Sequence, residues 1–524
     1  MKELVWHRQL LPAVDRFADR PFVTDTGAGT TTSYAEHGSR VLRLTNALNK
    51  ELGLAREDRF AVLSLNSGRF EELYHAGLMG GGVVNPLNLR FAPRELTHVL
   101  ADSATKVVFV DALFAPVIDA VREAAGVRTV VLMGDGTGSG TAPHDVSYED
   151  LIAAGEEVVP AEPEEEDAVM LMYTGGTTGL PKGVLLTQRS MMLTLYHLQM
   201  TFRLDAEEVF LAQVPMFHAA SMGAILGSPV SGGQLVTVPF FDPGTVLKVL
   251  KSHRPSNTIM VPTMISMLMA HEDYAPDALS SLQRFTYGAS PMPAPVLERL
   301  RQDAPHIGLF QGYGMTESAA LVCVLNPEDH ERGGELLKSA GRPVPGTILS
   351  IQDETGTEVP LGEVGEVCVR GGQYMQEYWR RPEETAEAFR DGWYHSGDAG
   401  YLDKDGYLYL VDRTKDMIVT GGENVYSTEV EQAVATHPAV AQVAVIGVPD
   451  DTWGEAVRAI VVLVPGQTAT EQELIEHCHG LIAGYKIPKG VTFREEPLPL
   501  SGAMKVLKRE LRAPYWEGRD RAVN

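Results

Sequence analysis

The sequence predicts a multidomain protein of mixed class, with an α/β region followed by a smaller α+β region. Its 524 residues exceed what a single ordinary core accommodates. Through the first part of the chain, short apolar segments alternate with helical patterns, which is typical of βαβ units and a largely parallel sheet. Beyond Arg413 the pattern becomes a compact mixture of helices and strands. We therefore expect one domain over residues 1–412 and a second over residues 413–524.

The elements follow in order. In the first alternating block we expect strands at 60–65, 107–110 and 130–133, and helices at 70–78, 93–100 and 116–125. A glycine-rich surface loop is expected at 134–143, and a second alternating block spans 189–309. Short β runs at 366–370 and 407–411 accompany Asp-Gly turns at 391–392 and 405–406. The C-terminal domain is expected to hold helices at 428–436 and 471–482 and strands at 443–448 and 459–464.

Composition excludes several classes of protein. A net charge of −25 argues against nucleic-acid binding, which requires a basic surface. The cysteines Cys323, Cys368 and Cys478 show no paired spacing, so we expect no disulfide framework, no zinc site and a cytoplasmic location. No apolar run approaches ~18 residues, so no transmembrane segment is expected. Peripheral membrane contact, and the choice between monomer and homodimer, stay open.

The most informative segment runs from Tyr173 to Gly183. It contains four glycines, three threonines and Lys182 between two apolar strand-like segments. Glycine-rich backbone can close around an anion, and hydroxyl and ammonium groups add donors suited to phosphate. A Walker loop has Gly before its Lys and Ser or Thr after it, whereas Pro181 and Gly183 flank Lys182 here. The segment therefore predicts a nucleotide-phosphate loop of another kind.

Further motifs follow in the chain: Tyr287–Pro291, Gln311–Ser318, Tyr394–Asp398, Asp412–Asp416, Gly421–Asn424 and Leu500–Leu511. Together with the phosphate loop, and in this order, they resemble the ANL superfamily of adenylate-forming enzymes, which includes acyl-CoA synthetases, nonribosomal adenylation domains and luciferases. The resemblance extends from residue 59 to Leu511. It implies a large N-terminal domain of sandwiched sheets and helices and a small, mobile C-terminal α+β lid.

The resemblance also implies a site for ATP and Mg²⁺. Tyr313 would stack on adenine, Asp398 would accept the ribose hydroxyls, and Thr174 and Glu317 would hold Mg²⁺, whose preferred ligands are hard oxygens. Arg413 would contact ribose or phosphate, and the lid would rotate about Lys415. The complete set of expected nucleotide-binding and cofactor-binding residues is Thr174, Gly175, Gly176, Thr177, Thr178, Gly179, Lys182, Gly288, Ala289, Ser290, Gln311, Gly312, Tyr313, Gly314, Met315, Thr316, Asp398, Arg413, Lys415, Gly421, Gly422 and Asn424.

The catalytic lysine implied by the resemblance is Lys505, with Lys508 in reserve. The downstream Lys-Arg-Glu-Leu string fixes this register. An ammonium group suits a step in which carboxylate attack on the α-phosphate builds negative charge on oxygen. Family members generally carry glycine directly before this lysine, whereas this chain carries Met504. Methionine lacks glycine's easy access to positive φ, which bears on how Lys505 is presented.

The expected reaction joins a carboxylic acid to CoA through an acyl-AMP intermediate, with ATP as the co-substrate. Glu317 and His218 are the other expected catalytic residues, and His218 lies in a Pro-Met-Phe-His element that resembles the mouth of the family's acyl site. The acyl pocket is expected to include His218, Met222, Thr263, Tyr287 and Ala319. These residues favour a hydrophobic acid, with a medium-chain or long-chain fatty acid ahead of an aryl or alicyclic acid.

Three alternative functions are considered. Two are enzymes that use the same acyl-AMP intermediate, and the third is a binding protein without activity. An amide-forming ligase would pass the acyl group to an amine, and a carrier-loading enzyme would pass it to a carrier-protein thiol. No Asp-Ser-Leu carrier signature follows Leu511, so a carrier would be a separate chain. A binding protein derived from an inactive enzyme is disfavoured because Lys182, Glu317, Asp398 and Lys505 are all present.

Overall fold

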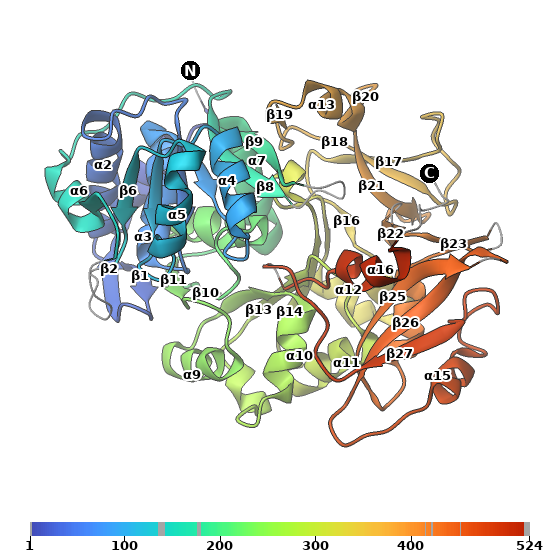
Figure 1. Cartoon of the computed structure of the whole chain (residues 1–524). Coiled ribbons are helices and arrows are strands. Elements are labelled where there is room, and N and C mark those ends of the chain that lie inside the picture. Colours follow the sequence, from blue (N-terminus) through green and yellow to red (C-terminus); the bar gives the residue numbers. More distant parts are fainter. Residues whose placement is uncertain are drawn as a thin grey trace.

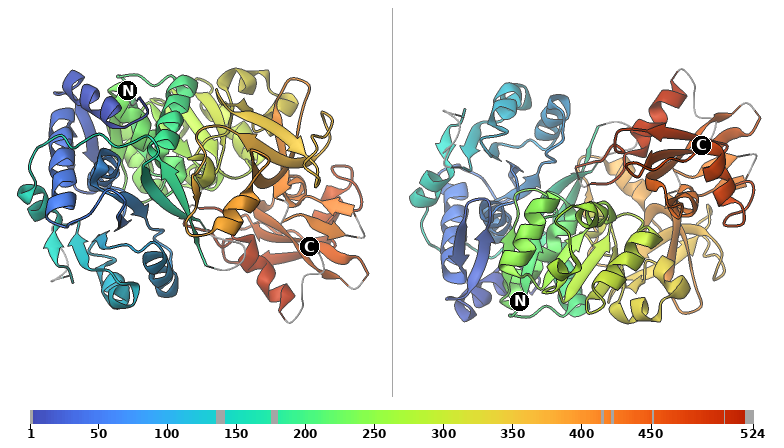
Figure 2. Two further views of the ribbon diagram at one scale, coloured as in Figure 1. Left: turned by 90° about the horizontal axis from the view of Figure 1, so that it is seen from above. Right: turned by 90° about the horizontal axis from the view of Figure 1, so that it is seen from below.

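The computed structural model describes residues 3–134, 142–174, 180–413, 416–420, 423–450, 452–502 and 504–517. Within these residues the chain forms a large N-terminal domain with three sheets and a smaller C-terminal domain with one sheet. The C-terminal domain, orange to red in Figures 1 and 2, lies at one side of the N-terminal domain in every view. The predicted class, α/β followed by α+β, is confirmed.

An eight-stranded sheet forms one half of the N-terminal domain. Its strand order is β19-β9-β8-β4-β3-β5-β6-β7, and the strands from β4 to β7 pair in parallel. Strands such as β5 are buried along their whole length, as parallel strands covered on both faces require. The bounds are β3 (Arg59–Leu63), β4 (Val83–Pro86), β5 (Val107–Val110), β6 (Thr129–Leu132), β7 (Val146–Ser147), β8 (Ala168–Thr174), β9 (Lys182–Thr187) and β19 (Glu377–Tyr378).

A nine-stranded sheet forms the other half, in the order β16-β15-β14-β13-β12-β10-β11-β1-β2. Its central strands are again parallel, and β15, β16 and β2 are antiparallel additions at the two edges. The bounds are β1 (Pro21–Asp25), β2 (Thr30–Ser33), β10 (Val209–Ala212), β11 (Gln234–Thr237), β12 (Asn257–Met260), β13 (Arg284–Gly288), β14 (Gly308–Tyr313), β15 (Cys323–Leu325) and β16 (Arg342–Pro343).

The third and fourth sheets are smaller and mostly antiparallel. The third contains β17 (Ile348–Gln352), β18 (Gly365–Arg370), β20 (Phe389–Arg390), β21 (Trp393–Leu402) and β22 (Leu408–Arg413). The main chain of Arg413 pairs with Asp398 and so still belongs to this sheet. The C-terminal sheet contains β23 (Ile418–Thr420), β24 (Glu423–Val425), β25 (Val440–Asp450), β26 (Gly454–Leu463) and β27 (Gly490–Arg494).

Helices begin and end where local chemistry favours it. Ser33 caps α2 by accepting from the Glu36 amide, while the Glu36 carboxylate accepts from the Ser33 amide. Gly126, at φ 73°, ends α5. The bounds are α1 (His7–Arg16), α2 (Tyr34–Lys50), α3 (Gly68–Ala76), η1 (Gly77–Gly81), α4 (Pro93–Asp102), α5 (Ala115–Ala125), α6 (Tyr148–Ala154), α7 (Gln188–Phe202), η2 (Ala219–Ser221), η3 (Gly223–Gly227), α8 (Ser228–Ser231), α9 (Pro243–His253), α10 (Pro262–Ala270), η4 (Pro276–Leu279), α11 (Ala294–Asp303), η5 (Thr316–Ser318), α12 (Pro327–Arg332), η6 (Gly334–Lys338), α13 (Pro382–Ala388), α14 (Ser427–Ala435), α15 (Glu471–Cys478) and α16 (Lys508–Trp516).

Most predicted elements lie within two residues of the observed ones. Three elements differ by more: the strands expected at 443–448 and 459–464 are β25 (Val440–Asp450) and β26 (Gly454–Leu463), and the helix expected at 471–482 is α15, which ends at Cys478. Gly480 has φ 82°, which an α-helix cannot include, so the predicted length was wrong. Most of the loop expected at 134–143 lies outside the described residues. Among the helices that the structure describes, none has the length and apolar character needed to cross a membrane.

Candidate active site

Two predicted motifs meet at the carboxyl ends of the neighbouring parallel strands β13 and β14. Tyr287 pairs with Gln311, and Gly288 pairs with Gly312. A Cβ atom on Gly288 would lie 2.1 Å from the Gly312 carbonyl oxygen, so the close approach of the two backbones requires glycine. Ligands of open α/β sheets bind at such strand ends. The carboxyl ends of β13 and β14 thus bring together five of the predicted residues: Gly288, Ala289, Ser290, Gln311 and Gly312.

The turn after β14 carries Glu317 and is tightly folded. A Cβ atom on Gly314 would lie 1.8 Å from the Ala320 carbonyl oxygen. Ala319 and Ala320 have φ of 51° and 113°, values that non-glycine residues seldom adopt. Such strain is concentrated at functional sites, at a cost of roughly 1–3 kcal/mol per residue. The turn, with Met315, Thr316 and Glu317 in it, is therefore held in an unusual conformation next to the strand end.

Asp398, on β21 of the third sheet, contacts the end of β14. The Tyr313 hydroxyl donates to the Asp398 carboxylate over 2.6 Å, and the Asp398 amide donates to Ser396 Oγ over 3.1 Å. Burial, and then the negative charge of Asp398, raise the pKa of Tyr313 well above its ordinary value. Tyr313 therefore stays a neutral donor and keeps the carboxylate in place.

Glu317 is connected to the phosphate-loop lysine through a tyrosine that the sequence analysis missed. The Tyr378 hydroxyl donates to Glu317 Oε1 over 2.9 Å. Lys182 Nζ lies 3.6 Å from the centre of the Tyr378 ring and 3.5 Å from Glu384 Oε2. Thr174 pairs with Lys182 across β8 and β9. Burial, followed by the charge of Glu317, raises the pKa of Tyr378, so its hydroxyl keeps its proton.

Several predicted residues cannot be placed. Eight of them lie outside the described residues: Gly175, Gly176, Thr177, Thr178, Gly179, Lys415, Gly421 and Gly422. The main chains of Arg413 and Asn424 belong to β22 and β24, and their side chains are outside the description. The roles expected for these residues stay predictions.

His218 stands at the start of η2 as a neutral imidazole. Burial, and secondarily the positive charge of Lys505, lower the pKa of His218 to about 3. Its Nδ1 accepts a hydrogen bond of 3.1 Å from the Ala220 amide, so the neutral ring carries its proton on Nε2. His218 can therefore donate a hydrogen bond from Nε2 without titrating near neutral pH.

The predicted acyl-pocket residues come from four segments. Met222 and Ala319 are fully buried in the largest apolar cluster. Thr263, on α10, is half-buried. Tyr287 belongs to the second apolar cluster, and its hydroxyl group lies 2.9 Å from His330 Nε2. The surroundings of these side chains are predominantly apolar, and their contact with a substrate stays a prediction.

The expected catalytic lysine, Lys505, and its reserve, Lys508, have different surroundings. Met504, directly before Lys505, packs against the same apolar cluster as Ala220, so the loop after residue 500 approaches the acyl-site element, and the charge of Lys505 lowers the pKa of His218. Lys508 instead contacts Ser427 Oγ at 2.6 Å and Glu431 Oε1 at 2.7 Å within the C-terminal domain. Met504 has φ 61°, the left-handed conformation that glycine adopts without strain. The main chain before Lys505 therefore keeps a glycine-like shape although the residue is methionine.

A side-chain network supports the strand that carries Asp398. His395 Nδ1 lies 2.8 Å from Glu366 Oε2 and 3.3 Å from Cys368 Sγ, and Glu366 Oε1 accepts from the Gly397 amide over 3.0 Å. These three side chains are the one group with the spacing of metal ligands among the residues that the structure describes. Arg390 Nη2 lies 2.7 Å from the same His395 nitrogen, so a guanidinium group already borders the cluster. The cysteine spacing in the sequence did not indicate this network.

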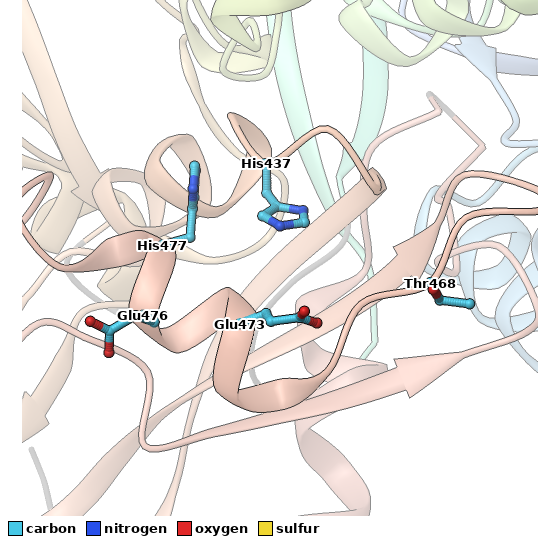
Figure 3. Close-up of a pocket in the computed structure, with 5 residues that line it drawn as sticks. All are labelled: His437, Thr468, Glu473, Glu476 and His477. Carbon is cyan, nitrogen blue, oxygen red and sulfur yellow. The ribbon is translucent and has the colours of Figure 1, made fainter.

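A surface pocket of the C-terminal domain shares no residue with the candidate site. Figure 3 shows it between the end of α14 and α15, lined by His437, Thr468, Glu473, Glu476 and His477. The two imidazole rings meet edge to face at 5.1 Å, and His477 Nε2 lies 2.7 Å from Thr436 Oγ1. These contacts join α14 to α15 within the domain.

Comparisons with known proteins identify the family of the chain. Residues 11–379 match the family model "AMP-binding enzyme", and residues 429–505 match "AMP-binding enzyme C-terminal domain". The chain is 39% identical to a feruloyl-CoA synthase from Amycolatopsis sp, over 93% of this chain and 94% of that one. It is 36% identical to the long-chain-fatty-acid–CoA ligase FadD13 of Mycobacterium tuberculosis, over 92% and 93%. The crystal structure of ATP-bound MatB from Rhodopseudomonas palustris superposes with a TM-score of 0.88 at 29% identity, covering 98% of this chain and 99% of that one.

Proposed function

Because the chain belongs to the AMP-binding enzyme family and is an adenylate-forming acyl-CoA ligase, we propose that it activates a hydrophobic carboxylic acid, most favourably a medium-chain or long-chain fatty acid. ATP supplies the adenylate, and CoA receives the acyl group. The observation that carries the proposal is the approach of the Lys505 loop to the acyl-site element, where Met504 packs against the same apolar cluster as Ala220. The charge of Lys505 also reaches the neutral imidazole of His218, and an ammonium group together with such a donor suits a substrate carboxylate and the phosphate that it attacks.

In the proposed first half-reaction, a carboxylate oxygen of the acid attacks the α-phosphorus of ATP. The bond from that phosphorus to the bridging oxygen of pyrophosphate breaks, which yields acyl-AMP and pyrophosphate. Lys505 stabilises the negative charge that builds on the phosphate oxygens, and Lys182 binds the departing pyrophosphate. His218 donates from Nε2 to the carboxylate and so orients it.

Nucleotide recognition is assigned to residues of β14 and β21, which the Tyr313–Asp398 hydrogen bond joins. Tyr313 lies against adenine, and Asp398, held by the Tyr313 hydroxyl, accepts the two ribose hydroxyls. A carboxylate and a threonine hydroxyl are hard oxygen donors, so Glu317 and Thr174 fit a magnesium ion bound together with phosphates. When bound, Mg²⁺ would neutralise charge on the pyrophosphate oxygens. The hydrogen bond from Tyr378 fixes the Glu317 carboxylate for this purpose.

In the second half-reaction, the CoA sulfur attacks the acyl carbon after loss of the thiol proton, and AMP leaves. The C-terminal domain would rotate about Lys415 between the two half-reactions, so that the segment from Gly421 to Asn424 shapes the path of the thiol. Exclusion of water by this domain would protect acyl-AMP from hydrolysis.

The side chains assigned to the acyl pocket support an uncharged tail. Met222, Thr263, Tyr287 and Ala319 carry no charge, and burial keeps His218 neutral. A second carboxylate on the substrate would find no cation among these five residues, whereas an alkyl chain or an aromatic ring would meet apolar surface. An aryl or alicyclic acid is therefore the second candidate, and a relative named feruloyl-CoA synthase is a specific reason to test it.

The test is a panel of acids assayed for ATP-dependent pyrophosphate release, with saturated fatty acids of increasing length beside benzoic and cinnamic acids. A maximum of kcat/KM among fatty acids supports the proposal, and a maximum among the aromatic acids replaces it with an aryl-CoA ligase. Addition of CoA should produce the acyl thioester and AMP. Product formation with amines or with a carrier-protein thiol, and none with CoA, would identify an amide-forming or carrier-loading enzyme instead.

A further inference from the structure

The loop that carries Lys505 rests on a turn of the N-terminal domain, residues 88–91. Arg90 Nη1 donates to the Leu500 carbonyl oxygen, and Arg90 Nη2 lies 3.9 Å from Met504 Sδ. The Met504 side chain also packs against the apolar cluster around α9, α10 and β13. Two points of contact, one on each side of residue 502, thus join the C-terminal loop to the large domain.

Gly502 lies between these two points, in close contact with Asn88. A Cβ atom on Gly502 would lie 2.2 Å from Asn88 Oδ1 and 2.9 Å from Asn88 Cγ. Turning the Asn88 side chain away would break the hydrogen bond of 3.0 Å that its Oδ1 accepts from the Arg90 amide. A side chain at position 502 would therefore disturb the approach of the loop to this turn.

Contacts within the loop transmit this support to Lys505. Leu500 and Val506 form an antiparallel bridge, and the Ser501 amide donates to the Lys505 carbonyl oxygen over 2.7 Å. The Lys505 amide in turn lies 3.2 Å from Ser501 Oγ. Because the loop is closed by these bonds, fixing the Leu500 carbonyl fixes the backbone of Lys505.

We propose that Arg90 and Asn88 form a docking turn that positions Lys505 for acyl-AMP formation and releases the loop before acyl transfer to CoA. The inference rests on the proposed function, since it assigns Lys505 to the first half-reaction. Arg90 is an exposed positioning residue, and water can replace its bond to Leu500 when the C-terminal domain rotates. The contact therefore stabilises the closed arrangement without preventing its release.

The test compares Arg90→Ala and Arg90→Lys with a matched control, Arg94→Ala, which removes an exposed arginine from the first turn of α4. Loss of one hydrogen bond should lower the rate of pyrophosphate release by about 3- to 10-fold in Arg90→Ala. The rate of CoA acylation from pre-made acyl-AMP should stay within about twofold. Arg90→Lys should recover part of the first rate, and Arg94→Ala should change neither.

Gly502→Ala is a second, independent variant, because its methyl group would push the loop from Asn88. It should also slow pyrophosphate release while sparing acyl transfer, with an unchanged thermal unfolding midpoint of the whole chain. If Arg90→Ala matches Arg94→Ala in both half-reactions, or slows both half-reactions equally, the docking turn has no such role. If the wild-type enzyme itself releases no pyrophosphate with any acid, the proposed function fails instead.

Discussion

The Tyr313 hydroxyl donates a hydrogen bond of 2.6 Å to the Asp398 carboxylate, which joins the end of β14 to β21 in another sheet. Bonds of this kind, with a charged acceptor, are shorter and stronger than neutral ones. Asp398 is 9% exposed, so most of this residue is enclosed. The bond therefore holds an acceptor for a diol at the place where the nucleotide is proposed to bind.

Tyr313→Phe should raise the KM for ATP. The substitution keeps the ring and removes the donor, and one such bond contributes roughly 1.5–3 kcal/mol when its acceptor is charged. Part of that bond is replaced by water, so we expect an increase in KM of about 10-fold with a smaller change in kcat. Steady-state kinetics with varied ATP provides the measurement. Tyr401→Phe, at a tyrosine stacked on Tyr409 in the third sheet, is the control. Equal effects of the two variants would contradict the role of Tyr313.

Lys505→Ala should separate the two half-reactions. Removal of a charge that stabilises the transition state should slow acyl-AMP formation by about 10²- to 10³-fold. The reaction of CoA with pre-made acyl-AMP should be largely spared, because that step needs no charge at the α-phosphate. Rapid-quench assays of each half-reaction measure the difference. An equal loss of rate in both half-reactions would exclude a role confined to the first step. An unchanged rate of acyl-AMP formation would instead favour Lys508 as the catalytic lysine.

Short sequence motifs predicted most residues of the candidate site, but they did not predict the side-chain contacts between distant segments. Gly288, Gly312 and the residues around Glu317 could be predicted because they lie in short motifs that resemble those of the adenylate-forming enzymes. Tyr378 could not be predicted, because it reaches Glu317 only through the pairing of β19 with β9, across nearly two hundred residues. Arg90 gave no signal for the same reason, since its partner lies 410 residues away. The helix predicted at 471–482 was too long, because the positive φ of Gly480 cannot belong to an α-helix.

Acid should destabilise the protein in part through His218. Its folded-state pKa of about 3 lies below the ordinary value of 6.5, so between these pH values the unfolded chain binds a proton that the folded chain does not. This contribution to stability is present above pH 6.5 and is lost as the pH falls toward 3. His218→Gln should therefore lose about 2 kcal/mol less unfolding free energy than wild type between pH 7 and pH 5.

Urea unfolding at the two pH values measures this difference. His253→Gln, at an exposed histidine, is the control for replacing an imidazole on the protein surface. Other buried histidines, such as His75, are present in all three proteins, so their contribution cancels. An identical loss in His218→Gln and wild type would show that His218 titrates alike in the folded and unfolded chains.

Met504→Gly should leave the rate of acyl-AMP formation unchanged or raise it. At φ 61° a methionine is strained by about 1 kcal/mol, which glycine avoids, whereas loss of its partly buried side chain costs a similar amount. Met504→Ala separates the two effects, because alanine keeps the strain and loses the side chain. We therefore expect the alanine variant to form acyl-AMP about fivefold more slowly than the glycine variant, in pyrophosphate-release assays at saturating ATP. A collapse of activity in Met504→Gly would mean that the methionine side chain itself is required to present Lys505.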